Sequence, residues 1–189
     1  HNRCRRQRQM CIRDREAGLA GLVGGLNTVH ADYNNDGFTD IFILRGAWLG
    51  KGGKHPNSLL RNNGDGTFSD VTKSSGLLSF HPTQTAAWAD VNNDGYLDLF
   101  IGNESRSNES HSCELYINQK NGKFLEKSSE YNLSSIKGFV KGVVFGDINN
   151  DQWPDLYLSV MGGVNLLFRN DFGIFKNISK SAGVEDPKY

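Results

Sequence analysis

The sequence predicts an all-β protein built from repeated units of four short antiparallel strands, and three observations indicate this fold class. Glycine is frequent, at 22 of 189 residues, whereas proline occurs only 4 times; this glycine content is typical of a chain with many tight turns. No window in the body of the chain has the hydrophobic period of a helix. The chain also repeats itself: Asp32, Asp90 and Asp147 begin three similar segments, 58 and then 57 residues apart, which favours a repeat architecture.

The formal net charge of zero hides an uneven distribution. Residues 1–15 hold six Arg and one Asp, so this head has a net charge of +5 and the remaining residues have a net charge of −5. An acidic body argues against nucleic acid as the main partner, because phosphate binding needs a basic surface. Every apolar run is far shorter than the ~20 residues of a membrane-spanning helix, so we expect no membrane span.

Residues 1–15 are expected to be a non-native or disordered head. The segment 7–15 resembles a translated adapter remnant, and the head contains no trace of the repeat. We therefore exclude it from the interpretation of the fold.

The first repeated element is an aspartate-rich loop with the pattern D-x-N-x-D-G-x-x-D. Each copy is followed by a short apolar run, as expected for a loop that leads into a strand. The third copy departs from the pattern, because Gln152 replaces the glycine at position 6 and Pro154 occupies position 8.

Two further elements complete each repeat. An Asn- and Gly-rich turn lies between apolar stretches at residues 60–68, 115–124 and 167–175, and such turns predict β-hairpins because Asn and Gly accept a positive φ. A closing element rich in small residues follows, at 74–78, 129–133 and 181–184. Residues 16–20 fit the closing element too, so we expect the body to begin with the end of a preceding unit.

Each unit is predicted to hold four strands. The expected strands lie at about 24–32, 40–46, 58–63 and 67–72, then 83–90, 97–103, 113–119 and 123–129, and finally 140–147, 155–161, 165–170 and 174–179. Four antiparallel strands per repeat are typical of β-propeller blades. Since a closed propeller needs roughly four to eight blades, we expect a propeller fragment. The predicted parts are 16–77 (the remnant and blade A), 78–133 (blade B), 134–183 (blade C) and 184–189 (the start of a further blade).

The repeated loops carry the predicted chemistry. Positions 1, 3, 5 and 9 offer side-chain oxygens and position 7 offers a backbone carbonyl, and such hard oxygen ligands suit Ca²⁺ better than Mg²⁺, which resists dehydration. Zinc and copper are disfavoured because the loops contain no His or Cys. The predicted ligands are Asp32, Asn34, Asp36, Phe38, Asp40, Asp90, Asn92, Asp94, Tyr96, Asp98, Asp147, Asn149, Asp151, Trp153 and Asp155.

Two other structures could explain such a loop, namely an EF-hand and a polar turn without a metal. An EF-hand requires Glu at position 12 and flanking helices, but position 12 is Ile43, Ile101 or Leu158 within an apolar run. A single loop of this kind can also be a polar turn without a metal. Three copies with the same oxygen positions favour calcium, because converging aspartates repel each other without a cation. We expect the third site to be the weakest, since Gln152 is not glycine.

These elements resemble FG-GAP (VCBS-type) repeats, as in the calcium-binding β-propellers of integrin α-subunits and in cartilage acidic protein. The resemblance covers residues 16–187, and residues 88–98 and 62–71 are closest to the family pattern. It implies a calcium-bound propeller with the calcium loop between the first and second strands of each blade. It also implies an extracellular, periplasmic or cell-surface location, without implying one activity.

The favoured function is a non-catalytic extracellular binding or adhesion scaffold. Its expected partners are an unknown protein or glycan ligand and the remaining blades of the propeller. The alternative is the propeller portion of a secreted polysaccharide-active lyase or hydrolase. No catalytic residue is assigned, because the sequence has no GxSxG, HExxH or P-loop motif. The loops at 46–57, which contain Trp48, and at 103–112 are the predicted partner contacts. Cys113 is expected to be a half-buried strand residue.

Overall fold

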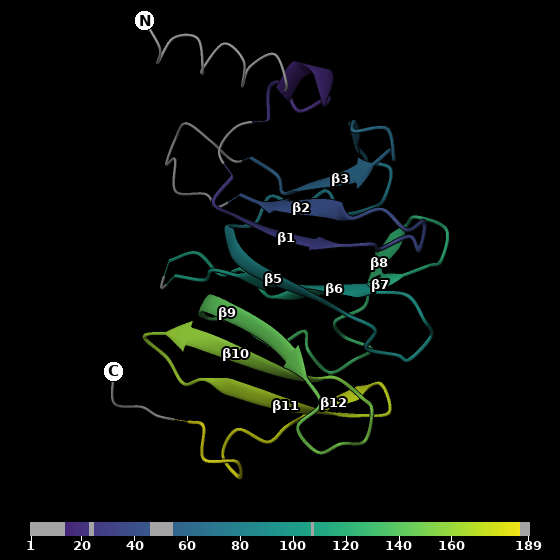
Figure 1. Cartoon of the computed structure of the whole chain (residues 1–189). Coiled ribbons are helices and arrows are strands. Elements are labelled where there is room, and N and C mark those ends of the chain that lie inside the picture. Colours follow the sequence, from purple (N-terminus) through teal and green to yellow (C-terminus); the bar gives the residue numbers. More distant parts are fainter. Residues whose placement is uncertain (1–13, 23–24, 46–54, 107, 186–189) are drawn as a thin grey trace, which may run out of the picture.

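The computed structural model describes residues 14–22, 25–45, 55–106 and 108–185. In this part of the chain, twelve strands form three four-stranded antiparallel sheets, which we call blades A, B and C. Figure 1 shows the blades stacked face to face in the order of the sequence. The all-β fold is confirmed, and a strand lies within or close to each of the twelve predicted ranges. The outermost strands are shorter than predicted, since the strands expected at 67–72 and 123–129 span only Phe68–Asp70 and Phe124–Glu126. Most of the head, Trp48 and residues 46–54 lie outside the described residues.

Within each blade the strands are neighbours in the order of the sequence. Blade A contains β1 (Asn27–Ala31), β2 (Asp40–Leu44), β3 (Ser58–Asn62) and β4 (Phe68–Asp70). Blade B contains β5 (Thr83–Ala89), β6 (Asp98–Asn103), β7 (Glu114–Asn118) and β8 (Phe124–Glu126). Blade C contains β9 (Phe139–Gly146), β10 (Asp155–Met161), β11 (Leu166–Asp171) and β12 (Ile174–Asn177).

The hydrophobic core lies between the blades, because a single sheet cannot bury both of its faces. One cluster joins blade A, through Phe42 and Leu59, to blade B, through Leu99 and Ile101. A second cluster joins blade B, through Phe100 and other residues, to blade C. Alternate residues of β6 thus face opposite neighbours, as the two-residue period of a strand requires.

Blade C presents the equivalent face without a neighbour. Tyr157 of β10 occupies the place that Phe42 and Phe100 hold in the other blades, and it pairs with Val144 and Leu167 on the adjacent strands. Val144 is 55% exposed. This face therefore has the composition of a blade junction but nothing packs on it among the described residues.

Closing elements bind the outermost strand of the following blade. The carbonyl of Ser75 accepts a hydrogen bond from the backbone N–H of Phe124, and the carbonyl of Ala17 accepts one from Phe68 in the same way. A Cβ at Gly76 would lie 2.8 Å from the carbonyl oxygen of Phe124. Residues 16–20 thus contact blade A as the closing element of one blade contacts the next.

In blades B and C, a buried asparagine forms a hydrogen bond to the preceding blade. Asn118, at the end of β7, donates from its side chain to the carbonyls of Tyr33 in blade A (2.8 Å) and Leu97 (3.1 Å). The equivalent Asn170, at the end of β11, donates to the carbonyl of Val91 in blade B at 2.9 Å. Both asparagines are almost fully buried, so these bonds satisfy carbonyls that water cannot reach.

Part of the predicted contact loop at 103–112 instead helps to join blades B and C. Its first residues, Asn103 and Glu104, are buried, and Glu104 forms a bridge with Phe139 and an ion pair with Lys141 of blade C. Cys113 is also fully buried, so the expectation of a half-buried residue was wrong, and burial raises the pKa of its thiol to about 12.

Substituting Gly102 by alanine is expected to destabilise the junction between blades B and C. The new Cβ would lie 2.7 Å from Thr85 Cγ2 and 2.8 Å from both Val140 Cγ1 and Val143 Cγ2. Overpacking of this kind costs about 1–3 kcal/mol, so urea denaturation should show a loss of that size. Gly146→Ala is the matched control, because no heavy atom lies within 4 Å of its added Cβ. Equal stability of the two variants would contradict this packing.

Removing the Asn118 side chain is expected to cost about 1–3 kcal/mol of unfolding free energy, because a buried carbonyl then loses its partner. Asn62→Ala, at the equivalent place in blade A, is the control. The side chain of Asn62 donates only to the carbonyl of Thr39 in its own blade, at 3.2 Å. The Asn62→Ala variant should therefore lose less unfolding free energy than the Asn118 variant. The inter-blade role of Asn118 would be wrong if both variants lost the same stability.

Candidate metal centre

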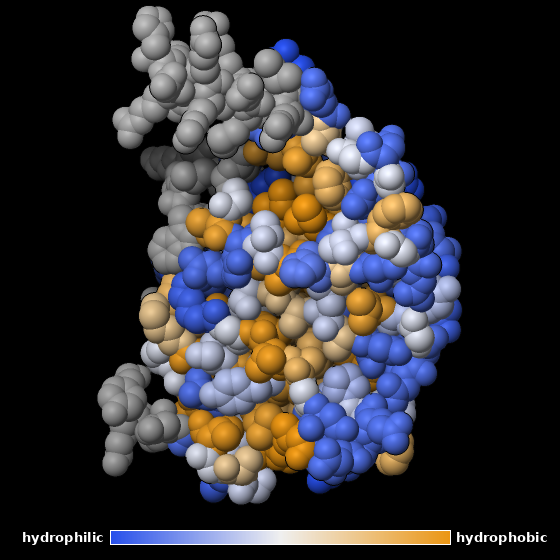
Figure 2. Space-filling view, viewed as in Figure 1, coloured by the Kyte–Doolittle hydropathy of each residue, from blue (hydrophilic) through white to orange (hydrophobic). Residues whose placement is uncertain are grey.

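The three aspartate loops lie along one edge of the molecule. They join β1 to β2, β5 to β6 and β9 to β10, and in Figure 1 they follow one another down the right side of the stack. Figure 2 shows that this edge is hydrophilic, whereas hydrophobic residues gather in a band across the first strands of the blades. The connection between the first and second strands is the place that the resemblance implied.

Within each loop, the side-chain oxygens of positions 1 and 3 both accept a hydrogen bond from the backbone N–H of position 5. In blade A, Asp32 Oδ1 and Asn34 Oδ1 accept hydrogen bonds from the backbone N–H of Asp36 at 3.0 and 3.2 Å. The corresponding distances are 2.9 and 3.1 Å in blade B and 3.1 and 3.2 Å in blade C. The three loops therefore have the same geometry.

Position 5 completes the turn. Asp36 Oδ1 accepts from the backbone N–H of Phe38 at position 7, at 2.9 Å, and the equivalent bonds are 3.0 Å in blade B and 2.9 Å in blade C. These are Asx-turns, in which a short polar side chain fixes the backbone two residues on. They place the side chains of positions 1, 3 and 5 on the inside of the loop.

Position 6 requires a left-handed backbone. Gly37 and Gly95 both have φ of 86°, and Gln152 in the third loop has φ of 69°. No heavy atom lies within 4 Å of a Cβ added to either glycine. The preference for glycine is therefore conformational and not a matter of space.

The position-9 aspartates are buried and bind the backbone of their own blade. Asp98 accepts from the N–H of Val91 at 3.0 Å and from that of Asn118 at 2.8 Å, which connects the loop to β7. The equivalent residues Asp40 and Asp155 make the same two bonds. All three carboxylates are at most 1% exposed. Sequence analysis considered these side chains only as ligands and missed this role.

The loops concentrate negative charge. The pKa of Asp98 is raised to about 7, because the effects of burial and of the Asp94 and Asp90 carboxylates outweigh the backbone hydrogen bonds that lower it. The pKa of Asp40 is raised to about 6 by burial and by the corresponding carboxylates of Asp36 and Asp32, against the same lowering by backbone hydrogen bonds. The carboxylates of positions 1 and 5 are thus close enough to position 9 to repel it.

The donor set of each loop fits a hard cation. Among the described residues, no group of three or more His, Cys, Asp or Glu side chains is arranged to hold a metal by itself. The carboxylate at position 9 accepts hydrogen bonds from backbone amides. However, the oxygens of positions 1 and 3 already converge, and each carboxylate oxygen retains a second lone pair. An all-oxygen set of this kind, crowded with negative charge, suits Ca²⁺.

Neighbouring loops also contact each other. Asn35 at position 4 of the first loop donates from its side chain to the carbonyl of Gly95 in the second, at 3.0 Å. Asn93 donates to the carbonyl of Gln152 in the third loop at 3.2 Å. The acceptor is the carbonyl of position 6 each time. The backbone conformation at position 6 therefore also determines where the preceding loop finds its hydrogen-bond acceptor.

Within the described residues, no helix has the length and the hydrophobicity that a membrane-spanning segment requires.

Comparison with known proteins gives the repeat a family. The family model described as FG-GAP-like repeat matches residues 32–101 and 90–158. Cartilage acidic protein 1 of Xenopus tropicalis is 30% identical over 145 residues, which cover 76% of this chain and 21% of that protein. Cartilage acidic protein 1 of Homo sapiens is 29% identical over 159 residues, which cover 82% of this chain and 22% of that protein. This chain spans about a fifth of the length of these relatives.

The two family matches overlap and together include all three aspartate loops. Each matched segment begins at an aspartate loop and ends in the second strand of the next blade. The chain belongs to the FG-GAP-like repeat family.

Proposed function

We propose that this chain is a calcium-stabilised repeat module that acts as a non-catalytic binding or adhesion scaffold outside the cytoplasm. The observation that carries the proposal is the threefold repetition of one loop geometry, with converging oxygens at positions 1 and 3 in every blade. A turn needed only to connect two strands would not have to keep the same oxygen atoms in all three copies.

The proposed calcium ligands are the oxygens of positions 1, 3, 5 and 9 and the carbonyl of position 7 in each loop. A bound ion would relieve the repulsion between the carboxylates and hold a loop whose ordering costs about 1–2 kcal/mol per residue. Three ions would change the net charge of the body from −5 to +1. Calcium sites of extracellular modules have dissociation constants of roughly 10⁻⁴–10⁻³ M, which favours an extracellular, periplasmic or cell-surface location.

The proposed partners are the remaining blades of a propeller and a protein or glycan ligand. The face of blade C formed by Val144, Tyr157 and Leu167 repeats the composition of the two described junctions, so a further blade of the same kind would bury it.

Calcium is expected to raise the melting temperature of the chain. An ion at ten times its dissociation constant stabilises the fold by about 1.4 kcal/mol per site, which corresponds to a shift of several degrees for a chain of this size. Differential scanning fluorimetry with millimolar Ca²⁺ and then with excess EGTA measures this effect, and calorimetric titration gives the number of sites.

The matched variants are Asp36→Asn, at position 5 of the first loop, and Asp65→Asn, in a turn outside the loops. The first should remove one calcium site from the titration, whereas the second should remove none. Absence of binding heat at millimolar calcium, with a melting temperature that does not respond to EGTA, refutes the calcium proposal.

The third site is proposed to be the weakest, because Gln152 holds a left-handed φ without being glycine. Gln152→Gly is expected to stabilise the calcium-free chain by about 1 kcal/mol and to tighten calcium binding at that site. Gly95→Gln is the reciprocal variant and should weaken the second site. Titration of variants that retain a single loop measures each affinity, and equal affinities at all three sites would show that the residue at position 6 is unimportant.

A further inference from the structure

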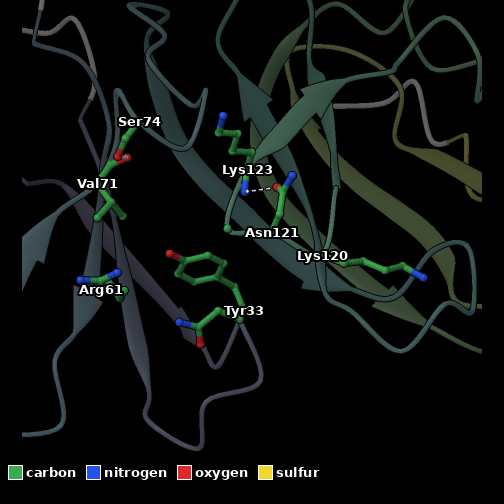
Figure 3. A pocket seen from close by; sticks show the side chains of 9 residues that line it. Tyr33, Arg61, Val71, Ser74, Lys120, Asn121 and Lys123 are labelled. Atoms are coloured by element: carbon green, nitrogen blue, oxygen red, sulfur yellow. Dashed lines mark hydrogen bonds between the residues drawn. The ribbon is translucent and has the colours of Figure 1, made fainter.

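A pocket of about 430 Å³ opens between blades A and B, beside the first aspartate loop. Blade A contributes Arg61 of β3 and Ser74, and blade B contributes Asn121 and Lys123 from the turn between β7 and β8. Figure 3 shows the two groups on opposite sides, with the ring of Tyr33 between them. The volume lies within the range of about 300–1,000 Å³ that is typical of small-molecule sites.

The hydroxyl group of Tyr33 reaches the pocket. Tyr33 is 2% exposed, and its ring packs against Trp88 and Phe124. Its hydroxyl is turned towards Val71 and Ser74 in the pocket (Figure 3). In the described part of the chain this hydroxyl makes no hydrogen bond. The hydroxyl can therefore donate a hydrogen bond to a ligand in the pocket and accept one from it.

The charges at the pocket are positive. The guanidinium of Arg61 and the ammonium of Lys123 have no ion-pair partner among the described residues. Lys120 also lines the pocket, but its Nζ lies 3.4 Å from Asp94 Oδ2, and Figure 3 shows its side chain directed away from the opening. The guanidinium of an arginine can bind a carboxylate or sulfate through two parallel hydrogen bonds.

The same place at the junction of blades B and C has different residues. The register of the strands makes Ile117 the equivalent of Arg61, and Val91 occupies loop position 2, where Tyr33 lies in blade A. Both are buried in the hydrophobic core between blades B and C. Of the two described junctions, only the first therefore has both the hydroxyl and the guanidinium. The arginine at the equivalent position of blade C, Arg169, pairs with Asp171.

We propose that this pocket binds an acidic sugar, whose carboxylate or sulfate group pairs with Arg61 and Lys123 and whose hydroxyls bond to Tyr33, Ser74 and Asn121. The lining is mostly polar, with the amides of Asn34 and Asn121, the hydroxyls of Tyr33 and Ser74 and a single valine, so it suits a ligand that carries several hydroxyls. An acidic saccharide unit supplies both the anion and the hydroxyls.

This inference deepens the proposed binding role and rests on it. Asp32 and Asp36 lie in the same loop as Tyr33, and their charge would oppose an anion in the pocket unless a cation offsets it. Binding of the sugar is therefore expected to be stronger with calcium than with EGTA. Calcium binding is measured separately by the melting experiment, so a failure of the pocket is distinguishable from a failure of the calcium sites.

Calorimetric titration of the whole chain tests the pocket, with glucuronic acid and glucose 6-sulfate as the two acidic probes and glucose as the neutral one. One or both acidic probes should bind, and glucose should bind at least about tenfold more weakly, because it lacks the charge-assisted bonds. The response to the two acidic probes distinguishes a carboxylated from a sulfated ligand.

Three variants locate the binding. Arg61→Gln should weaken binding about tenfold or more, and Tyr33→Phe, which removes only the hydroxyl, should weaken it several-fold. Arg169→Gln is the matched control, because Arg169 is the equivalent of Arg61 in blade C and pairs with Asp171; it should leave the affinity unchanged. Circular dichroism confirms that each variant is folded.

The proposal is overturned if neither acidic probe binds the folded chain in calcium, or if glucose binds as well as they do. It is also overturned if Arg61→Gln and Arg169→Gln change the affinity equally, since the binding would then reflect the general charge of the surface.

Discussion

The arrangement of the blades depends on one buried hydrogen-bond network at the end of each third strand. In blade B, the carboxylate of Asp98 accepts from the backbone N–H groups of Val91 and Asn118, and the side chain of Asn118 donates to the carbonyl of Tyr33 in blade A. The aspartate fixes the loop to its own sheet, and the asparagine fixes that sheet to the preceding loop. Blade C repeats the network with Asp155 and Asn170.

This network explains how a loop with many acidic side chains stays close to a hydrophobic core. Carboxylates buried as deeply as Asp40 and Asp98 need hydrogen-bond donors, and the backbone supplies two to each. The remaining acidic groups, at positions 1 and 5, are closer to solvent, where a cation could reach them. The aspartate at position 9 therefore has a structural role in addition to its proposed role as a metal ligand.

Variation between the copies occurs where the repeat does not constrain the residue. The residue at loop position 2 acts through its backbone: its N–H donates to the aspartate at position 9, and its carbonyl can accept from the asparagine of the next blade. Its side chain is therefore free to vary, and it is Tyr33, Val91 or Ile148 in the three loops. The side chain at this position then determines the character of the space between two blades. A polar pocket in one junction and a closed apolar core in the next can thus share the same backbone hydrogen bonds.

The sequence alone determined the strands, the hairpins and the loop geometry, because these depend on residues close together in the chain. The two-residue hydrophobic period, the Asn- and Gly-rich turns and the spacing of the aspartates all act over a few residues. The sequence also indicated that position 6 of the third loop needs a positive φ without a glycine, and Gln152 adopts one.

Only the tertiary structure decided how the blades meet. Asn118 and Tyr33 are 85 residues apart in the chain, and the pocket combines Tyr33 and Arg61 with a turn near residue 121. The oxygen pattern predicted ligands at position 9, but it could not reveal that the N–H groups of Asn62, Asn118 and Asn170 bind those carboxylates. Contacts of this kind depend on the stacking of sheets, and no local pattern in the sequence specifies which backbone groups the stacking brings together.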